Sequence, residues 1–149
     1  MKSKDNGFEK AFRQSLERLP GYSMRLYDNG GKPTDRTLLA DFLLSNRKGN
    51  FAFECKSTTG PSINYRDFGK SGSGIHAEQL AELVRWEQAR EDNHSLLALR
   101  YERTGTMVLL KLDPALAFFK NKKSINEKEA LDMGWAQKPH PDGGWMLWV

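Results

Sequence analysis

The sequence predicts an α/β protein in which a central mixed β-sheet is flanked by helices, with elements in the order αβββαββα. This prediction depends on an amphipathic helical pattern near the start, on the short strand-like runs that follow it, and on a second helical pattern ahead of another strand pair. Because the 149 residues contain no internal repeat and no sign of a second core, we expect residues 1–149 to form a single domain.

The first two elements follow from periodicity and turn residues. Apolar residues recur with helical spacing over 8–19, and Pro20-Gly21 ends the predicted helix. The polar residues 1–6 ahead of it are expected to be disordered. Residues 22–27 are typical of a strand, and the Asp-Asn-Gly-Gly run at 28–31 is typical of the turn after it.

A β-hairpin is predicted next. Residues 39–44 and 51–58 are short apolar runs of strand type. The polar residues 45–50 between them have the composition of a turn. Since the flanking residues are strongly apolar, we expect both strands to be covered on both faces.

Charged residues interrupt these two strands at positions that can meet. Side chains alternate across a strand, so Glu54 and Lys56 share one face while Phe53 and Cys55 point to the other. In the hairpin, Asp41 can lie beside Glu54 on the polar face. Two carboxylates suit Mg²⁺ or Mn²⁺, and a nearby ammonium suits a phosphate or an attacking water. A purely structural ion pair between Glu54 and Lys56 remains the alternative.

The second half of the chain begins with the Gly- and Ser-rich residues 59–74, which we expect to form a long structureless loop. Residues 75–90 have the strongest helical pattern of the sequence. The remaining predicted elements are strands over 96–101 and 106–112, helices over 115–119 and 124–133, and a terminal strand over 145–149.

Composition and motif spacing exclude several classes of protein. No apolar run approaches the ~20 residues that span a bilayer, no signal peptide opens the chain, and Cys55 is the only cysteine, so we expect a cytoplasmic protein. No zinc-site spacing is present. Gly69-Lys70-Ser71 lacks the earlier glycine of a phosphate-binding loop, where Asn64 stands, so no nucleotide cofactor is expected. The net charge of +4 permits a polyanionic partner without establishing one.

The order and spacing of these motifs resemble the PD-(D/E)xK nuclease superfamily and, within it, the RecU-type and archaeal-type (phage-like) Holliday junction resolvases. Ala40 stands where the proline that names the superfamily is usual, and Glu78 precedes Gln79 where RecU-type sequences usually have histidine. The matching segments cover most of the chain and are Gly7-Phe8-Glu9, Ala40-Asp41-Phe42, residues 51–58, Ile75-His76-Ala77-Glu78-Gln79 and Lys122-Lys123-Ser124-Ile125.

The resemblance implies a restriction-endonuclease-like core and a metal-dependent attack of water on a DNA phosphodiester. Asp41, Glu54 and the backbone carbonyl of Cys55 would bind Mg²⁺, for which Mn²⁺ is expected to substitute. Lys56 would orient or help to deprotonate the attacking water and offset charge in the transition state. Glu9 would complete a second metal position or hold a metal-bound water.

Glu9 and Gln79 each have a plainer alternative. Negative charge is favourable near a helix N-terminus, so Glu9 could be only a solvated helix glutamate. The resemblance implies that Gln79 hydrogen-bonds the water or Lys56, but it could equally be a polar residue on a helix face.

The implied partner is branched double-stranded DNA, a four-way junction resolved by paired symmetric nicks. The near two-fold symmetry of such a junction favours a homodimer with two sites. The late aromatic residues serve either its interface or ordinary core packing, and these residues are Phe118, Phe119, Trp135, Trp145 and Trp148. Two alternatives stay open: another endonuclease of the same fold (repair, nicking or restriction type) without junction preference, and a non-catalytic DNA-binding relative.

Basic residues in predicted loops are the candidates for DNA contacts. They form a nucleic-acid track if the fold gathers them on the face of the site, and they are solubilising charges if it does not. These candidates are Arg36, Arg47, Lys48, Arg66, Lys70, Lys122 and Lys123.

Overall fold

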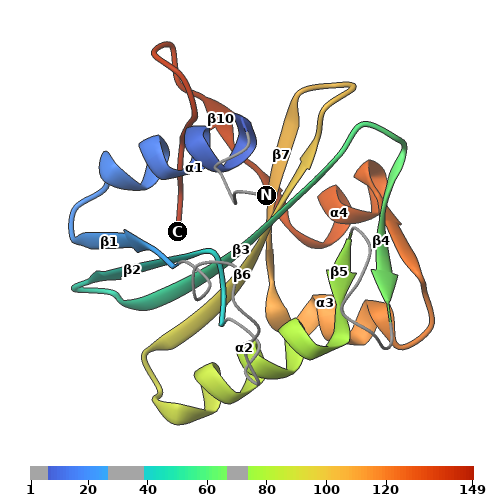
Figure 1. Cartoon of the computed structure of the whole chain (residues 1–149), viewed down its shortest axis with the longest axis horizontal. Helices are drawn as coiled ribbons and strands as arrows, with labels where there is room; N and C mark the ends of the chain where they lie inside the picture. Colours follow the sequence, from blue (N-terminus) through green and yellow to red (C-terminus); the bar gives the residue numbers. More distant parts are fainter. Residues whose placement is uncertain (1–6, 27–38, 67–73) are drawn as a thin grey trace, which may run out of the picture.

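The computed structural model describes residues 7–26, 39–66 and 74–149 (Figure 1). The helices are α1 (Gly7–Glu17), α2 (Ala77–Ala89), α3 (Leu112–Phe119) and α4 (Glu127–Met133). The strands are β1 (Tyr22–Arg25), β2 (Phe42–Asn46), β3 (Gly49–Thr58), β4 (Ser62–Arg66), β5 (Ile75–His76), β6 (Asn93–Tyr101), β7 (Thr106–Lys111), β8 (Ser124–Asn126), β9 (Trp135–Ala136), β10 (Lys138–Pro139) and β11 (Trp145–Met146). The expected disorder of residues 1–6 and the candidates Arg36 and Lys70 fall outside the described residues.

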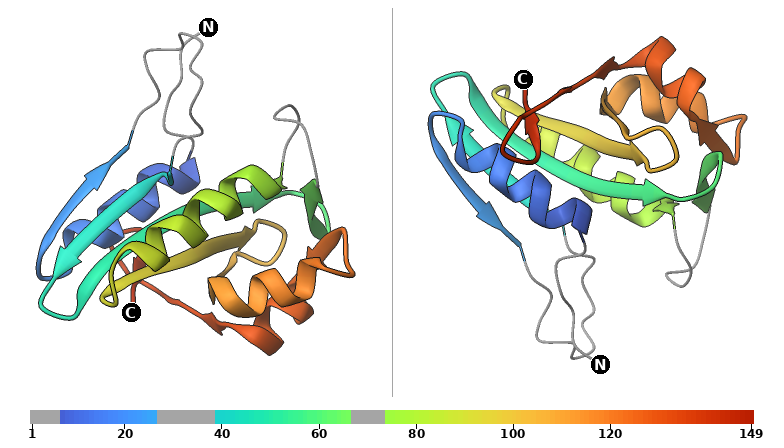
Figure 2. Two further views of the ribbon diagram at one scale, coloured as in Figure 1. Left: turned by 90° about the horizontal axis from the view of Figure 1, so that it is seen from below. Right: turned by 90° about the horizontal axis from the view of Figure 1, so that it is seen from above.

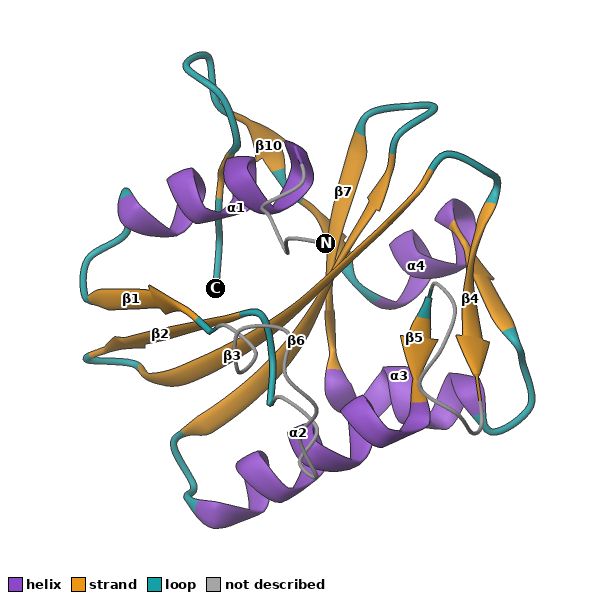
Figure 3. Cartoon of the chain, in the orientation of Figure 1, coloured by secondary structure: helices purple, strands orange, loops and turns teal. Residues whose placement is uncertain are grey.

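The central sheet contains six strands in the order β1-β2-β3-β6-β7-β9 (Figure 3). β3 and β6 run parallel, and the other neighbouring strands are antiparallel. The sheet is therefore mixed, as predicted. Because β3 lies between β2 and β6, its backbone is paired on both sides and its side chains have little access to water.

Helices cover both faces of this sheet, α1 on one face and α2 on the opposite one (Figure 2). Phe8 and Phe12 of α1 pack in one buried cluster with Phe53 of β3. Leu80 and Leu83 of α2 belong to the second cluster, on the other face. This arrangement confirms the predicted α/β class. In the part of the chain that the structure describes, no helix is long and apolar enough to cross a membrane.

The predicted hairpin is present, but its first strand begins later than expected. β2 starts at Phe42, which is the partner of Phe53 in β3. Asp41 therefore precedes the strand instead of lying within it, although its backbone N–H still donates to the carbonyl oxygen of Phe53 at 2.9 Å. The turn between the strands contains only Arg47 and Lys48.

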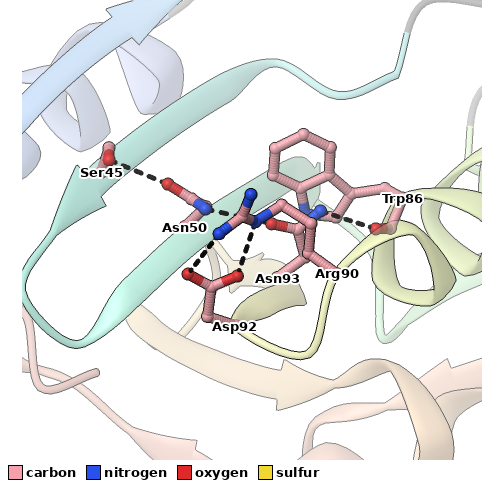
Figure 4. Close-up of polar contacts among 6 residues, drawn as sticks. All are labelled: Ser45, Asn50, Trp86, Arg90, Asp92 and Asn93. Carbon is pink, nitrogen blue, oxygen red and sulfur yellow. Dashed lines mark hydrogen bonds and ion pairs between the residues drawn. The ribbon is translucent and has the colours of Figure 1, made fainter.

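Close backbone and side-chain contacts join the start of β3 to the start of β6 and the end of α2 (Figure 4). Asn50 Nδ2 donates to Asn93 Oδ1 at 3.1 Å, and Asn93 Nδ2 donates to the carbonyl oxygen of Trp86 at 2.8 Å. At Gly49 the φ angle is +142°, and a Cβ there would lie 2.5 Å from the carbonyl oxygen of Asp92. Only glycine fits this junction without displacing the backbone.

The expectation of a structureless loop over 59–74 is wrong for its described residues. β4 forms there and pairs with β5 on one side and β8 on the other, as a second, three-stranded sheet. Ile63 of β4 is buried opposite Ile125 of β8, while its neighbour Asn64 is exposed. The alternating pattern is short, and its main partner β8 lies far along the chain, so local sequence did not reveal the strand.

Two helices begin later than their periodicity predicts. β5 takes Ile75 and His76 from the predicted helix 75–90, and β8 takes the start of the predicted helix 124–133. The Asn126 side chain accepts from the backbone N–H of Glu129 at 2.8 Å, and the Glu129 side chain accepts from the N–H of Asn126 at 2.9 Å. This capping box fixes where α4 begins.

The late aromatic residues do not share one environment. Phe119 and Trp145 are buried in the two clusters, so core packing is the correct interpretation for them. Phe118 and Trp135 are half-buried. Trp148 is 74% exposed, so it remains available to a partner.

Candidate active site

The site is built on β3, the strand at the centre of the sheet. Phe53 and Cys55 lie in the cluster beneath α1, whereas Glu54 and Lys56 form an ion pair and therefore share the opposite face. This confirms the alternation predicted from the sequence. Glu54 is 2% exposed, so a carboxyl group lies in the interior of the sheet on the side covered by α2.

Two donors contact one oxygen of Glu54. Lys56 Nζ lies 3.3 Å from Glu54 Oε2, and Gln79 Nε2 donates to the same oxygen at 2.7 Å. Gln79 reaches this position because it is in the first turn of α2, which packs against β6 beside β3. The expected contact of Gln79 with Lys56 is thus replaced by one with Glu54. Gln79 Oε1 is buried and has no hydrogen-bond partner among the described residues, which leaves it free to accept from a water.

Asp41 lies directly before the first residue of β2. Its Oδ2 accepts a hydrogen bond from the backbone N–H of Cys55 at 2.8 Å, which holds the carboxylate against β3 one residue beyond Glu54. Its backbone carbonyl accepts from the N–H of Leu26 at 2.8 Å, next to β1. Asp41 therefore lies beside Glu54, as the sequence predicts, although it is fixed by the hairpin pairing and not by a strand of its own.

The carboxyl groups are electrostatically strained. Burial raises the pKa of Glu54 to about 8, and the negative charge of Asp41 contributes to the rise while Lys56 opposes it. Burial also raises the pKa of Asp41; the Cys55 N–H opposes this rise, and the charge of Glu9 adds to it. Burial, followed by Asp41 and Glu54, raises the pKa of the Cys55 thiol, so this side chain is a poor nucleophile and only its backbone is useful here.

Arg25 is a site residue that the sequence analysis missed. Its guanidinium pairs with the carboxylate of Glu9 on α1 and lies 5.2 Å from the centre of the Phe42 ring. The Arg25 side chain is only 9% exposed, and its charge opposes the rise that burial causes in the pKa of Asp41. The available signal was its position as the sole basic residue in the predicted strand 22–27.

The donors at Asp41 and Glu54 fit a hard divalent cation. Both are oxygen ligands. Burial is the main cause of the raised pKa of each, nearby negative charge adds to the rise, and a bound cation would offset both effects. Among the described residues, no three His, Cys, Asp or Glu side chains gather closely enough to hold a metal ion between them. The two carboxylates would be joined by the implied carbonyl of Cys55. Glu9 is paired with Arg25, and its expected role at a second metal position stays a prediction.

The described DNA-binding candidates fall into two groups. Arg66 is the last residue of β4, and Lys122 and Lys123 directly precede β8, where the Tyr65 N–H donates to the carbonyl oxygen of Lys123 at 2.8 Å. Arg47 and Lys48 are exposed in the turn between β2 and β3. The described candidates therefore do not form one continuous segment of the fold, and the predicted track stays a prediction.

Comparisons with known proteins support the fold. No protein-family model matches the sequence, and no curated protein matches it. Among solved structures, the chain is similar to Hjc, a Holliday junction resolvase from the archaeal hyperthermophile Archaeoglobus fulgidus, with a TM-score of 0.61 and 16% identity over 87% of this chain and 93% of that chain. The chain therefore shares the mixed α/β fold of that archaeal protein, with a central mixed sheet flanked by helices.

Proposed function

We propose that this chain is a metal-dependent DNA endonuclease that resolves four-way junctions by paired symmetric nicks. The observation that carries this proposal is the group formed by Asp41, Glu54 and Lys56 in the middle of a resolvase-like sheet. Burial makes an ionised carboxylate unfavourable. An ordinary ion pair could form at the surface of a strand and would not require this burial. A site for a cation and an anionic substrate accounts for the arrangement.

In this mechanism Asp41, Glu54 and the carbonyl of Cys55 would hold Mg²⁺, with Mn²⁺ as a substitute. When bound, the ion supplies a polarised phosphate oxygen and a more acidic water. Lys56 and Gln79 both contact Glu54 Oε2, which orients the carboxyl group and leaves Glu54 Oε1 without either contact.

The ammonium of Lys56 has a second task in the proposed reaction. The Lys56 side chain lies on the same face as Glu54 and is 21% exposed, so it can reach a bound phosphate. There it orients the attacking water and offsets the negative charge that develops on the phosphate in the transition state. Gln79 Oε1 accepts a hydrogen bond from that water.

The two groups of basic residues are proposed to contact duplex arms of the bound junction. Arg66, Lys122 and Lys123 would contact one arm, and Arg47 and Lys48 another. Paired nicks require two such sites, so we propose a homodimer that works in the cytoplasm of a prokaryotic or phage-infected cell.

The test is cleavage of end-labelled DNA in Mg²⁺, with a four-way junction, a Y-fork, a linear duplex and a single strand as parallel substrates. Symmetric paired nicks confined to the junction are expected. Asp41→Asn and Lys56→Ala should abolish cleavage, whereas Glu102→Gln, which changes an exposed carboxylate in the turn between β6 and β7, should not. Sedimentation of the protein with and without junction measures the dimer.

The outcomes separate the candidate functions. Equal cleavage of all substrates would retain the endonuclease and remove junction preference, which is the second candidate function of this fold. Junction binding without cleavage in Mg²⁺ or Mn²⁺ would contradict the catalytic proposal. Activity in Asp41→Asn equal to that of Glu102→Gln would show that the Asp41 carboxylate has a structural role only.

A further inference from the structure

A groove of about 800 Å³ lies at the end of the central sheet where β3 and β6 begin. Its walls come from the end of α2, the start of β6, the junction of β7 with α3, β9, and the residues after β11. None of the described candidate catalytic residues lines it. Its volume falls within the range of about 300–1,000 Å³ typical of ligand pockets. The groove is thus a separate feature from the proposed nuclease site.

The apolar part of the groove is aromatic and partly exposed. Phe51 and Leu96 line it from the central sheet, and Trp135 and Trp148 line it from the C-terminal part of the chain. Trp135 Nε1 donates to the carbonyl oxygen of Trp148 at 3.0 Å, and the two rings are nearly perpendicular, at 80°. Trp148 is nevertheless 74% exposed. Tryptophan is one of the residues that contribute most of the binding energy at protein interfaces.

The charged part of the groove is mainly acidic. Glu87, Glu91 and Asp113 line it, and the lining groups that can carry positive charge are Lys111 and His94. The chain as a whole has a net charge of +4, so this local excess of carboxylates is opposite in sign to the molecule. Such a surface repels phosphates and attracts cationic groups.

The wall formed by β6 and α2 is held in place before any partner binds. Asn93 lines the groove and is fixed by hydrogen bonds to Asn50 and to the carbonyl of Trp86 (Figure 4). Glu87 Oε2 accepts the backbone N–H of Ser95 at 2.7 Å, which fixes that carboxylate. A wall that is already ordered lowers the entropic cost of binding.

We propose that this groove docks an extended basic segment of a partner protein, in which lysine or arginine alternates with apolar residues. Apolar side chains of the segment would pack on Phe51 and Leu96. Its cationic groups would lie over the exposed indole of Trp148 and face Glu91 and Asp113. The inference rests on charge complementarity and does not depend on the nuclease activity.

The probe is a fluorescein-labelled nonapeptide of alternating lysine and leucine, measured by fluorescence anisotropy against metal-free protein without DNA. Comparison peptides replace lysine by glutamate, or leucine by serine, and spermine tests a free amine. Only the lysine–leucine peptide is expected to bind tightly. Trp148→Ala keeps both backbone hydrogen bonds of that residue and should weaken binding about thirtyfold. Glu91→Gln with Asp113→Asn should weaken it a further few-fold.

Matched controls change similar groups outside the groove. Tyr22→Ala removes another exposed aromatic side chain, 72% exposed, and Glu102→Gln another exposed carboxylate, and both should bind the peptide as the wild type does. Binding of the glutamate–leucine peptide with equal affinity, or an unchanged affinity in Trp148→Ala, would overturn the proposal. So would spermine binding as tightly as the peptide, or self-association of the chain that Trp148→Ala abolishes, since a small amine or a second copy would then be the occupant.

Discussion

Replacing Glu54 with glutamine is expected to stabilise the metal-free protein at pH 8, although it removes a proposed catalytic group. The folded-state pKa of Glu54 is about 8, above its ordinary value of 4.5. A raised pKa means that the folded state holds the proton more tightly than the unfolded state does. The stability contributed by the protonated carboxyl is therefore fully present below about pH 4.5 and is lost as the pH rises through about 8.

The magnitude follows from these two pKa values. Between pH 6 and pH 8 the free energy of unfolding falls by about 2 kcal/mol. In this range the carboxyl group is already ionised in the unfolded state but still protonated in the folded state, and each unit of pKa difference corresponds to about 1.4 kcal/mol. For a chain of this length, about 2 kcal/mol lowers the midpoint of thermal unfolding by about 4–8 °C. In Glu54→Gln the neutral amide imitates the protonated carboxyl at every pH, so this fall should disappear.

The assay is thermal unfolding from pH 5 to pH 9 in the presence of a chelator, for the wild type, Glu54→Gln and the exposed control Glu102→Gln. The wild type and the control should lose stability together from pH 5 to about pH 8, and Glu54→Gln should not follow them. Adding Mg²⁺ at pH 8 should raise the unfolding temperature of the wild type and not that of Glu54→Gln. Parallel pH profiles for all three proteins would refute the argument, because the carboxyl of Glu54 would then have no raised pKa.

Further predictions concern the neighbours of Glu54 and the fold around them. Lys56→Ala should lower the single-turnover cleavage rate at least about 100-fold while junction binding in gel shifts is retained, because the ammonium acts on the transition state. Arg25→Met should remove the charge that pairs with the largely buried Glu9 carboxylate and lower the free energy of unfolding by about 3–5 kcal/mol in urea, and adding Glu9→Gln should restore most of it. Ile63→Ala, in the buried side of β4, should cost about 2–5 kcal/mol in the same measurement. Gly49→Ala should cost about 1–3 kcal/mol, because of the positive φ and the carbonyl oxygen of Asp92.

The core of the site was predictable because it depends on strand alternation and hairpin pairing. A period of two residues places Glu54 and Lys56 on one face of β3, whatever the rest of the chain does. The pairing of Phe42 with Phe53 then brings Asp41 to β3. Both rules act over a short stretch of sequence. Asp41 was therefore placed correctly beside β3, although the start of β2 was predicted three residues too early.

The contacts that were not predicted join segments that are distant in sequence. The pair between Glu9 and Arg25 depends on how α1 crosses β1, and the packing of Phe8 and Phe12 sets that crossing. The same limit applies to β4. Its residues have the composition of a loop, and the strand depends on pairing with β8, which lies far along the chain. Gln79 was placed on the correct helix, but its contact with Glu54 depends on how α2 packs beside β3.

The burial of Glu54 argues against a purely structural role for the charged group on β3. If Glu54 and Lys56 served only stability, an apolar pair of similar size would serve it at least as well, because the attraction between buried charges rarely exceeds the cost of removing them from water. The hydrogen bond from Gln79 and the ion pair with Lys56 do not offset the cost of burial, since the pKa of Glu54 stays raised although both groups contact its carboxyl. The Glu54 carboxyl lowers the stability of the folded, metal-free protein at neutral pH. Its position is best explained by a cation that restores this stability when it binds. The comparison of Glu54→Gln with the wild type, with and without Mg²⁺, measures both halves of this argument.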